Sequence, residues 1–162
     1  MTNSAQTASP DPSEIIAALY DIVSGLAEMP RNWDSARSLF WPDARVQTVY
    51  SDRSQPLNFR NLSIEEWFER ASDRFRQTAF HEQSVISNSE TGGMIATAVS
   101  PYVSRHDPTG EVIERGVNYY TFIRTKSGWK VLQLVWEIER PGNPLSRNAA
   151  AALDRADWLR FG

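Results

Sequence analysis

The sequence predicts an α+β fold in which helices pack on one face of an antiparallel sheet. In the first half of the chain, apolar residues recur at helical spacing after capping residues, whereas from Phe80 onward the hydrophobic pattern changes to a period of two. The expected strands are joined by short polar connections, which favour antiparallel pairing. Helices that precede most of the strands are typical of an α+β arrangement of two layers.

The first expected helix begins at Asp11. With Pro12 at the first helical position and Glu14 three residues after the cap, Asp11 makes the pattern of a capping box. Aliphatic residues follow at helical spacing, and we expect this helix to end near residues 29–30. The small, polar residues 1–10 are expected to form a disordered leader.

Two more helices are expected before the main strands. Asn32 can cap a short helix that ends before WPDA, residues 41–44, after which RVQTVYS alternates as a first strand. Ser63 and Glu66 repeat the capping-box spacing at the start of a third helix, which carries one apolar stripe.

The second half of the chain contains four expected strands. They are FHEQSVIS, MIATAVSPYVSR, EVIERGVNYYTFIR and WKVLQLVWEIE, separated by NSETGG, DPTG and TKSG, and we expect them to form an antiparallel meander. RPGNP, residues 140–144, ends the sheet. The following segment predicts a short C-terminal helix with three apolar side chains that need a surface on which to dock, Leu153, Trp158 and Leu159.

Composition excludes several classes of function. The net charge is -3, with 17 basic and 20 acidic residues interspersed. The sequence therefore predicts no basic surface that would bind nucleic acid or an anionic membrane. Cysteine is absent, which removes disulfides and thiolate metal sites. We expect one cytoplasmic domain, residues 11–140, followed by a C-terminal extension, residues 141–162, and no nucleic-acid or membrane partner.

Several short segments in order resemble one known superfamily. They are LFWPDARV after the second helix, FHE at the start of the long strands and ERGVNYYTFIRTKSGWKVLQLVWEIE at their end. The last segment contains an R-G-hydrophobic-N run, a G-W pair and a W-x-x-E ending. Over residues 13–140 the chain resembles the nuclear transport factor 2-like superfamily, and most of all its SnoaL-like, polyketide-cyclase-like bacterial members.

This resemblance implies a cone-shaped fold, a half barrel of the cystatin-like kind whose curved antiparallel or mixed sheet wraps around the N-terminal helices. It also implies a deep pocket and frequent homodimers. We expect the dimer contact on the convex face of the sheet, where Val117, Tyr119 and Glu137 would lie. It does not imply one activity, because the superfamily includes isomerases, dehydratases, cyclases, epoxide hydrolases and non-catalytic modules.

Asn118 lies in a segment that otherwise suits a buried strand. Alternation places Asn118, Tyr120 and Phe122 on one face of that strand. Ketosteroid isomerases of the superfamily carry a hydrogen-bond donor to the substrate oxygen at the position that matches Asn118, so the resemblance points Asn118 into the cone. A buried amide without partners costs about 1–3 kcal/mol, so either the protein or a ligand satisfies it. Asn118 and Tyr120 are therefore catalytic candidates.

His81 is the third catalytic candidate, because imidazole has an unperturbed pKa near 6.5. Alternation places Phe80 and Glu82 on the opposite face, and only one of the two sets can point inward. The resemblance places Thr48 where the isomerases carry the carboxylate that abstracts a proton. A hydroxyl group is no useful base at neutral pH, so an isomerase mechanism of that kind is not expected.

Other side chains are expected to contact a ligand. Tyrosines combine a phenolic donor with a flat apolar body, and the resemblance places alternate residues of the last strand inward. The expected ligand-binding residues are Tyr20, Thr48, Tyr50, Tyr102, Phe122, Leu134 and Trp136. Glu111 and Glu114 are interpreted as solvated charges. Two histidines without metal-binding spacing predict no metal, and no cofactor is expected.

Two functions remain open. The pocket can bind a small, mostly apolar, oxygen-bearing ligand, with Asn118 and a tyrosine polarising an oxygen and His81 moving a proton in a cofactor-free lyase, isomerase or cyclase. Alternatively, the chain is a non-catalytic dimeric module for binding or interaction. An open apolar cavity with Asn118 and His81 facing each other would favour catalysis, and a filled cone would favour the module.

Overall fold

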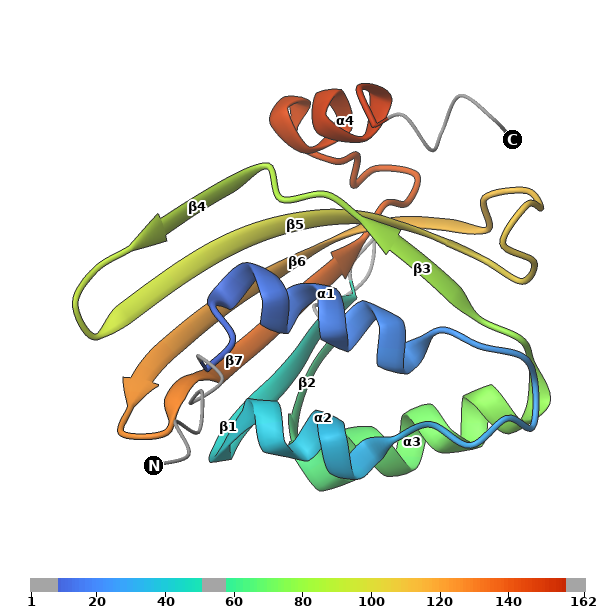
Figure 1. Ribbon diagram of the computed structural model, residues 1–162. Coiled ribbons are helices and arrows are strands. Elements are labelled where there is room, and N and C mark those ends of the chain that lie inside the picture. The colour runs from blue at the N-terminus through green and yellow to red at the C-terminus, as the bar shows by residue number, and fades with distance from the viewer. Residues whose placement is uncertain (1–8, 51–57, 157–162) are drawn as a thin grey trace, which may run out of the picture.

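A curved, unclosed sheet forms the centre of the fold in the computed structural model, which describes residues 9–50, with Tyr50 described in its backbone only, and residues 58–156. Within these residues seven strands make one sheet in the order β2-β1-β7-β6-β5-β3, with β4 paired to β5. Helices α1, α2 and α3 lie on one side of the sheet and α4 lies on the other (Figure 1). The sequence prediction of an α+β fold is confirmed.

The helices begin at the residues that the sequence predicts. Asp11 caps α1, Pro12–Val23, by accepting a hydrogen bond from the amide of Glu14, whose carboxylate accepts one in return. Asn32 caps α2, Trp33–Leu39, and Ser63 opens α3, Ile64–Gln77, with a second capping box. Helix α1 ends six residues before the expected break.

The end of α1 has a physical reason. Gly25 leaves the helix and exchanges two backbone hydrogen bonds with Phe80, at 2.7 and 2.9 Å between nitrogen and oxygen. This bridge ties the connection after α1 to the residue that opens β3, His81–Ser84. Because a contact across 55 positions of the chain decides this helix end, helical periodicity alone could not locate it.

The long strands form the expected antiparallel meander. They are β5, Ile95–Arg105, β6, Glu114–Thr125, and β7, Gly128–Ile138. Strand β1, Phe40–Tyr50, lies parallel to β7, with a register irregularity between Phe40 and Arg45, so the sheet is mixed. Two edge strands were not predicted: β2, Asn58–Ser63, and β4, Asn88–Thr91, which occupies part of an expected break.

Helix α4, Arg147–Asp154, covers part of the convex face of the sheet. Its Ala149 and Leu153 pack with Val103 and Val117, which project from β5 and β6 on that side. Leu153 is 1% exposed, so it docks as the sequence predicts. Trp158 and Leu159, expected to dock beside it, lie outside the described residues, as does most of the expected leader.

Candidate functional site

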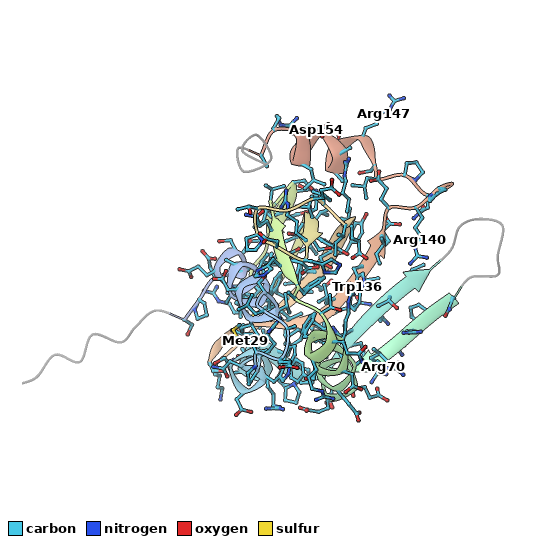
Figure 2. All side chains as sticks on the ribbon, turned by 90° about the vertical axis from the view of Figure 1, so that its right-hand side faces the viewer. Met29, Arg70, Trp136, Arg140, Arg147 and Asp154 are labelled. Carbon is cyan, nitrogen blue, oxygen red and sulfur yellow. The ribbon has the colours of Figure 1, made fainter. Side chains whose placement is uncertain are left out.

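A cavity of about 240 Å³ lies between the concave face of the sheet and helices α1 and α3. Small-molecule sites typically occupy roughly 300–1,000 Å³, so this cavity suits a small ligand. Most of its wall is aromatic or aliphatic. The lining residues are Leu19, Tyr20, Val23, Thr48, Arg60, Leu62, Trp67, Arg70, Ala71, Arg74, Phe75, Phe80, Glu82, Tyr102, Glu114, Asn118, Tyr120, Leu134, Trp136 and Ile138. Figure 2 labels Trp136 on β7 and Arg70 on α3.

The structure brings most of the expected site residues to this cavity. Those that line it are Tyr20, Thr48, Tyr102, Asn118, Tyr120, Leu134 and Trp136. Phe122 does not line it. That side chain is fully buried beneath Tyr120, with the two rings stacked at 5.7 Å between centroids. The side chain of Tyr50 lies outside the described residues, and His81 does not line the cavity.

Asn118 projects into the cone, as expected, but its amide nitrogen already has a hydrogen-bond partner in the protein. Nδ2 of Asn118 donates a hydrogen bond to the hydroxyl of Tyr20 at 2.7 Å. The Tyr20 hydroxyl lies 3.1 Å from Oγ of Ser100, which in turn donates to the carbonyl of Val85 at 3.1 Å. These bonds form a directed chain in which Asn118 holds Tyr20 in place, so positioning is the first role of the amide.

Strand β3 directs Glu82, rather than His81, toward the cavity. Phe80 is buried against Phe75 with their ring centroids 5.0 Å apart, and it lines the cavity together with Glu82. Alternation then sends His81 to the other face, where its Nε2 is buried without a hydrogen-bond partner. Burial and the charge of Arg31 lower the pKa of His81, an effect that Asp107 opposes. The expected arrangement of His81 opposite Asn118 is therefore absent.

Glu82 carries the most perturbed carboxyl group of the cavity. Burial, and then the neighbouring charge of Glu114, raise its pKa to about 8, although the charge of Arg74 opposes the shift. The side chain is half-buried, and it contributes to the cavity wall. At neutral pH Glu82 therefore holds a proton and can donate a hydrogen bond, yet a modest change in environment can ionise it.

Glu114 is a second cavity carboxylate, contrary to its interpretation as a solvated charge. The hydroxyl of Tyr102 donates a hydrogen bond to its Oε1 at 3.2 Å. Gly116 makes this contact feasible, because a Cβ at Gly116 would lie only 2.4 Å from the Tyr102 hydroxyl and 2.7 Å from the carbonyl oxygen of Glu137. Tyr102 and Gly116 are cross-strand partners. The glycine of the R-G-V-N run has no side chain, so the Tyr102 ring can lie across β6 at this position.

Thr48 occupies the expected position in the cavity wall. Its side chain is 3% exposed, and its Oγ1 is buried without a hydrogen-bond partner. An unsatisfied buried hydroxyl is costly, so a ligand or water in the cavity would stabilise it. Strand β1 thus supplies a hydroxyl to the cavity, whereas β3 and β6 supply the carboxyl groups.

Sequence reasoning missed three arginines of the cavity wall, Arg60 on β2 and Arg70 and Arg74 on α3. The signal for the last two was present, because Arg70 and Arg74 lie one helical turn apart at one edge of the apolar stripe of α3, next to Trp67 and Ala71. Among the described residues, no group of histidine, aspartate and glutamate side chains is arranged to hold a metal ion. Nor does any described helix have the length and hydropathy needed to cross a membrane.

Comparison with known proteins gives structural matches alone. No protein-family model and no curated protein sequence matches the chain. A nuclear transport factor 2-like protein with a cystatin-like fold from Novosphingobium aromaticivorans shares 17% identity, with a TM-score of 0.58 over 86% of this chain and 84% of that one. A nuclear transport factor 2-like protein of unknown function from Shewanella baltica shares 12% identity, with a TM-score of 0.57 over 79% and 90%.

A third similar structure comes from Streptomyces avermitilis and is provisionally assigned as a dehydratase of the nuclear transport factor 2-like family. It shares 17% identity with this chain, with a TM-score of 0.53 over 78% of this chain and 91% of that one. Identities this low establish a shared fold and no shared activity. The closer likeness to SnoaL-like members stays a prediction. The chain has the nuclear transport factor 2-like fold, of the cystatin-like kind, that the sequence predicts.

Proposed function

We propose that the chain is a lyase, isomerase or cyclase that moves a proton on a small, mostly apolar, oxygen-bearing molecule. One observation carries the proposal: the carboxyl group of Glu82, with a pKa of about 8, lines a largely apolar cavity. A general acid or base is most efficient when its pKa lies near the working pH. The provisional dehydratase assignment of the Streptomyces avermitilis protein is consistent with this class of chemistry.

In this proposal Glu82 takes the role that the sequence suggested for His81. Its ionised form removes a proton next to a carbonyl group, and its protonated form returns the proton elsewhere on the substrate or to a leaving hydroxyl. Tyr120 polarises the substrate oxygen. Burial, above all, raises the pKa of the Tyr120 hydroxyl, which therefore keeps its proton and can donate a hydrogen bond to developing negative charge. Asn118 positions Tyr20, whose hydroxyl is hydrogen-bonded to that of Tyr120.

Deuterium uptake tests this proposal without knowledge of the natural substrate. Small apolar ketones are incubated with the protein in D₂O, and loss of the α-proton signal is followed by NMR. We expect the wild type to accelerate exchange for part of the panel, and Glu82→Gln to reduce the acceleration by roughly 10²- to 10⁴-fold. Because the ionised form is the base, the rate should rise with pH and level off above about pH 8.

Glu90→Gln is the matched control, since Glu90 lies exposed on β4 and does not line the cavity. It makes the same chemical change and should leave exchange unaltered. Exchange that is absent from the whole panel with the wild type, or equally fast with Glu82→Gln, would contradict a role of Glu82 in proton transfer.

A binding module without catalysis is the second candidate. Two observations favour it: the resemblance places Thr48 where the isomerases carry a base, and Asn118 is already bonded to Tyr20. The same NMR samples separate the two candidates, because a binding module shows saturable ligand shifts without exchange.

We further propose that the chain acts as a homodimer. The surface we assign to the contact is the part of the convex sheet face that α4 leaves uncovered, where Ile95 is 59% and Tyr119 39% exposed. Light scattering should then give twice the 18.4 kDa of the chain, and the mass of a single chain would contradict the dimer.

A further inference from the structure

Two arginines of α3 form a cationic edge of the cavity. Arg70 and Arg74 are one helical turn apart, both are exposed, and both also contribute to the cavity wall, so they lie where the cavity meets solvent. Arg60, from β2, lines the same cavity. Strand β2 packs beside α3, so arginines approach this opening from two elements.

Arg70 and Arg74 differ from neighbouring arginines in their ion pairing. On the outer surface, Arg76 forms an ion pair with Asp73, and Arg37 forms one with Glu65. Among the described residues, neither Arg70 nor Arg74 is in an ion pair, and Arg74 instead lies over the ring of Phe80, 4.8 Å from its centroid. Like charges four residues apart destabilise a helix. Within the described part of the chain, the charge of Arg70 acts on Glu66 and that of Arg74 on Glu82, both without an ion pair. Two such charges beside an apolar cavity favour an anionic ligand.

The rest of the cavity wall indicates the chemistry of the remainder of the ligand. Leu134, Trp136 and Trp67 supply apolar wall, which suits a hydrocarbon or aromatic body. The Oγ1 of Thr48, buried without a partner, adds one polar contact inside the cavity. The site therefore combines an apolar wall, one unsatisfied hydroxyl and a cationic edge.

We propose that the ligand of this cavity is a small carboxylic acid, whose apolar body fills the cavity and whose carboxylate is held by Arg70 and Arg74. A guanidinium group presents its N–H donors as a planar fork that matches the two oxygens of a carboxylate. This inference rests on the proposed function in that it names the substrate class of the same site. The carboxylate binds the cationic edge, and the reacting carbon lies deeper, toward Glu82.

Calorimetric titration with matched pairs of probes tests the inference. The probes are apolar carboxylates of about six to twelve heavy atoms, such as 3-phenylpropanoate, each paired with its neutral amide and with the phosphate monoester of the same tail. We expect the wild type to bind carboxylates at least about tenfold more tightly than the amides, which corresponds to about 1.4 kcal/mol. In R70Q and in the double variant R70Q/R74Q the preference should fall to less than about threefold.

Arg76→Gln is the control, because it removes one positive charge from the same helix without touching the cavity. It should keep the carboxylate preference of the wild type. Equal binding of carboxylate and amide, absence of binding for the whole panel, retention of the preference in R70Q/R74Q, or tighter binding of the phosphate monoesters would each overturn the inference.

Glu82→Gln separates this inference from the proposed function. It should keep the carboxylate preference while it loses deuterium exchange. A protein that prefers carboxylates but shows no exchange would overturn the proposed catalysis alone, whereas exchange without a carboxylate preference would overturn this inference alone.

Discussion

The free energy of unfolding is expected to fall as the pH rises from about 4.5 to about 8, because of Glu82. The folded protein keeps the proton of this carboxyl group up to about pH 8, whereas the unfolded chain releases it near its ordinary pKa of 4.5. Between these values the folded state binds more protons, so stability decreases with pH. The total loss attributable to Glu82 is about 5 kcal/mol, and it is complete above its folded pKa.

Urea unfolding at pH 5 to 9.5 measures this effect, with Glu82→Gln as the reference. His81 acts in the opposite direction, because its lowered folded pKa makes the protein gain stability as the pH rises through about 6.5. The difference between wild type and Glu82→Gln removes that contribution. We expect similar stabilities at pH 5 and a clear advantage of the variant at pH 9. Curves that stay parallel over this range would show that Glu82 is ionised at neutral pH.

Loss of Arg31 is expected to cause the second large effect, a destabilisation of about 2–4 kcal/mol in Arg31→Ala. The side chain is 8% exposed and donates hydrogen bonds to four carbonyl oxygens, those of Val23, Gly25, Leu26 and Met29, at 2.7 to 3.1 Å. Its guanidinium group also lies over the ring of Phe75, 4.8 Å from the centroid. Without it, the carbonyl groups at the end of α1 lose their donors.

Chemical denaturation at neutral pH measures this loss against two comparison variants. Arg31→Lys keeps the charge but lacks the branched set of donors, so it should recover little of the stability. Arg37→Ala removes an exposed arginine paired with Asp34 and Glu65, and it should cost far less stability than Arg31→Ala, because exposed ion pairs contribute little. If Arg31→Ala behaves like Arg37→Ala, the segment that connects α1 to α2 does not depend on Arg31.

The parts of the fold that could be predicted from sequence are those specified by local chemistry. The side-chain oxygens of Asp11, Asn32 and Ser63 cap the three N-terminal helices, because the residues they bond lie three positions away. The meander of β5, β6 and β7 follows from alternation and short connections. The edge strand β4 could not be predicted, because exposed polar residues become a strand only through pairing with β5.

The site shows the same division between local and distant causes. Alternation correctly separated His81 from Phe80 and Glu82, but the choice of the inward set depends on the bridge between Phe80 and Gly25. Asn118 was placed in the cavity by resemblance, whereas its bond to Tyr20 joins residues 98 positions apart. A hydrophobic period specifies two faces of a strand, and only the tertiary contacts specify which face is covered by the helices.

A direct titration of Glu82 tests the central claim, that this cavity holds a carboxyl group protonated at neutral pH. The side-chain carboxyl carbons of glutamate are labelled with ¹³C, and their chemical shifts are followed by NMR from pH 3 to 10, with Glu82→Gln used to assign the resonance. We predict one glutamate signal with a midpoint near pH 8 that is missing from the variant. A midpoint for Glu82 near the ordinary value of 4.5 would contradict the account.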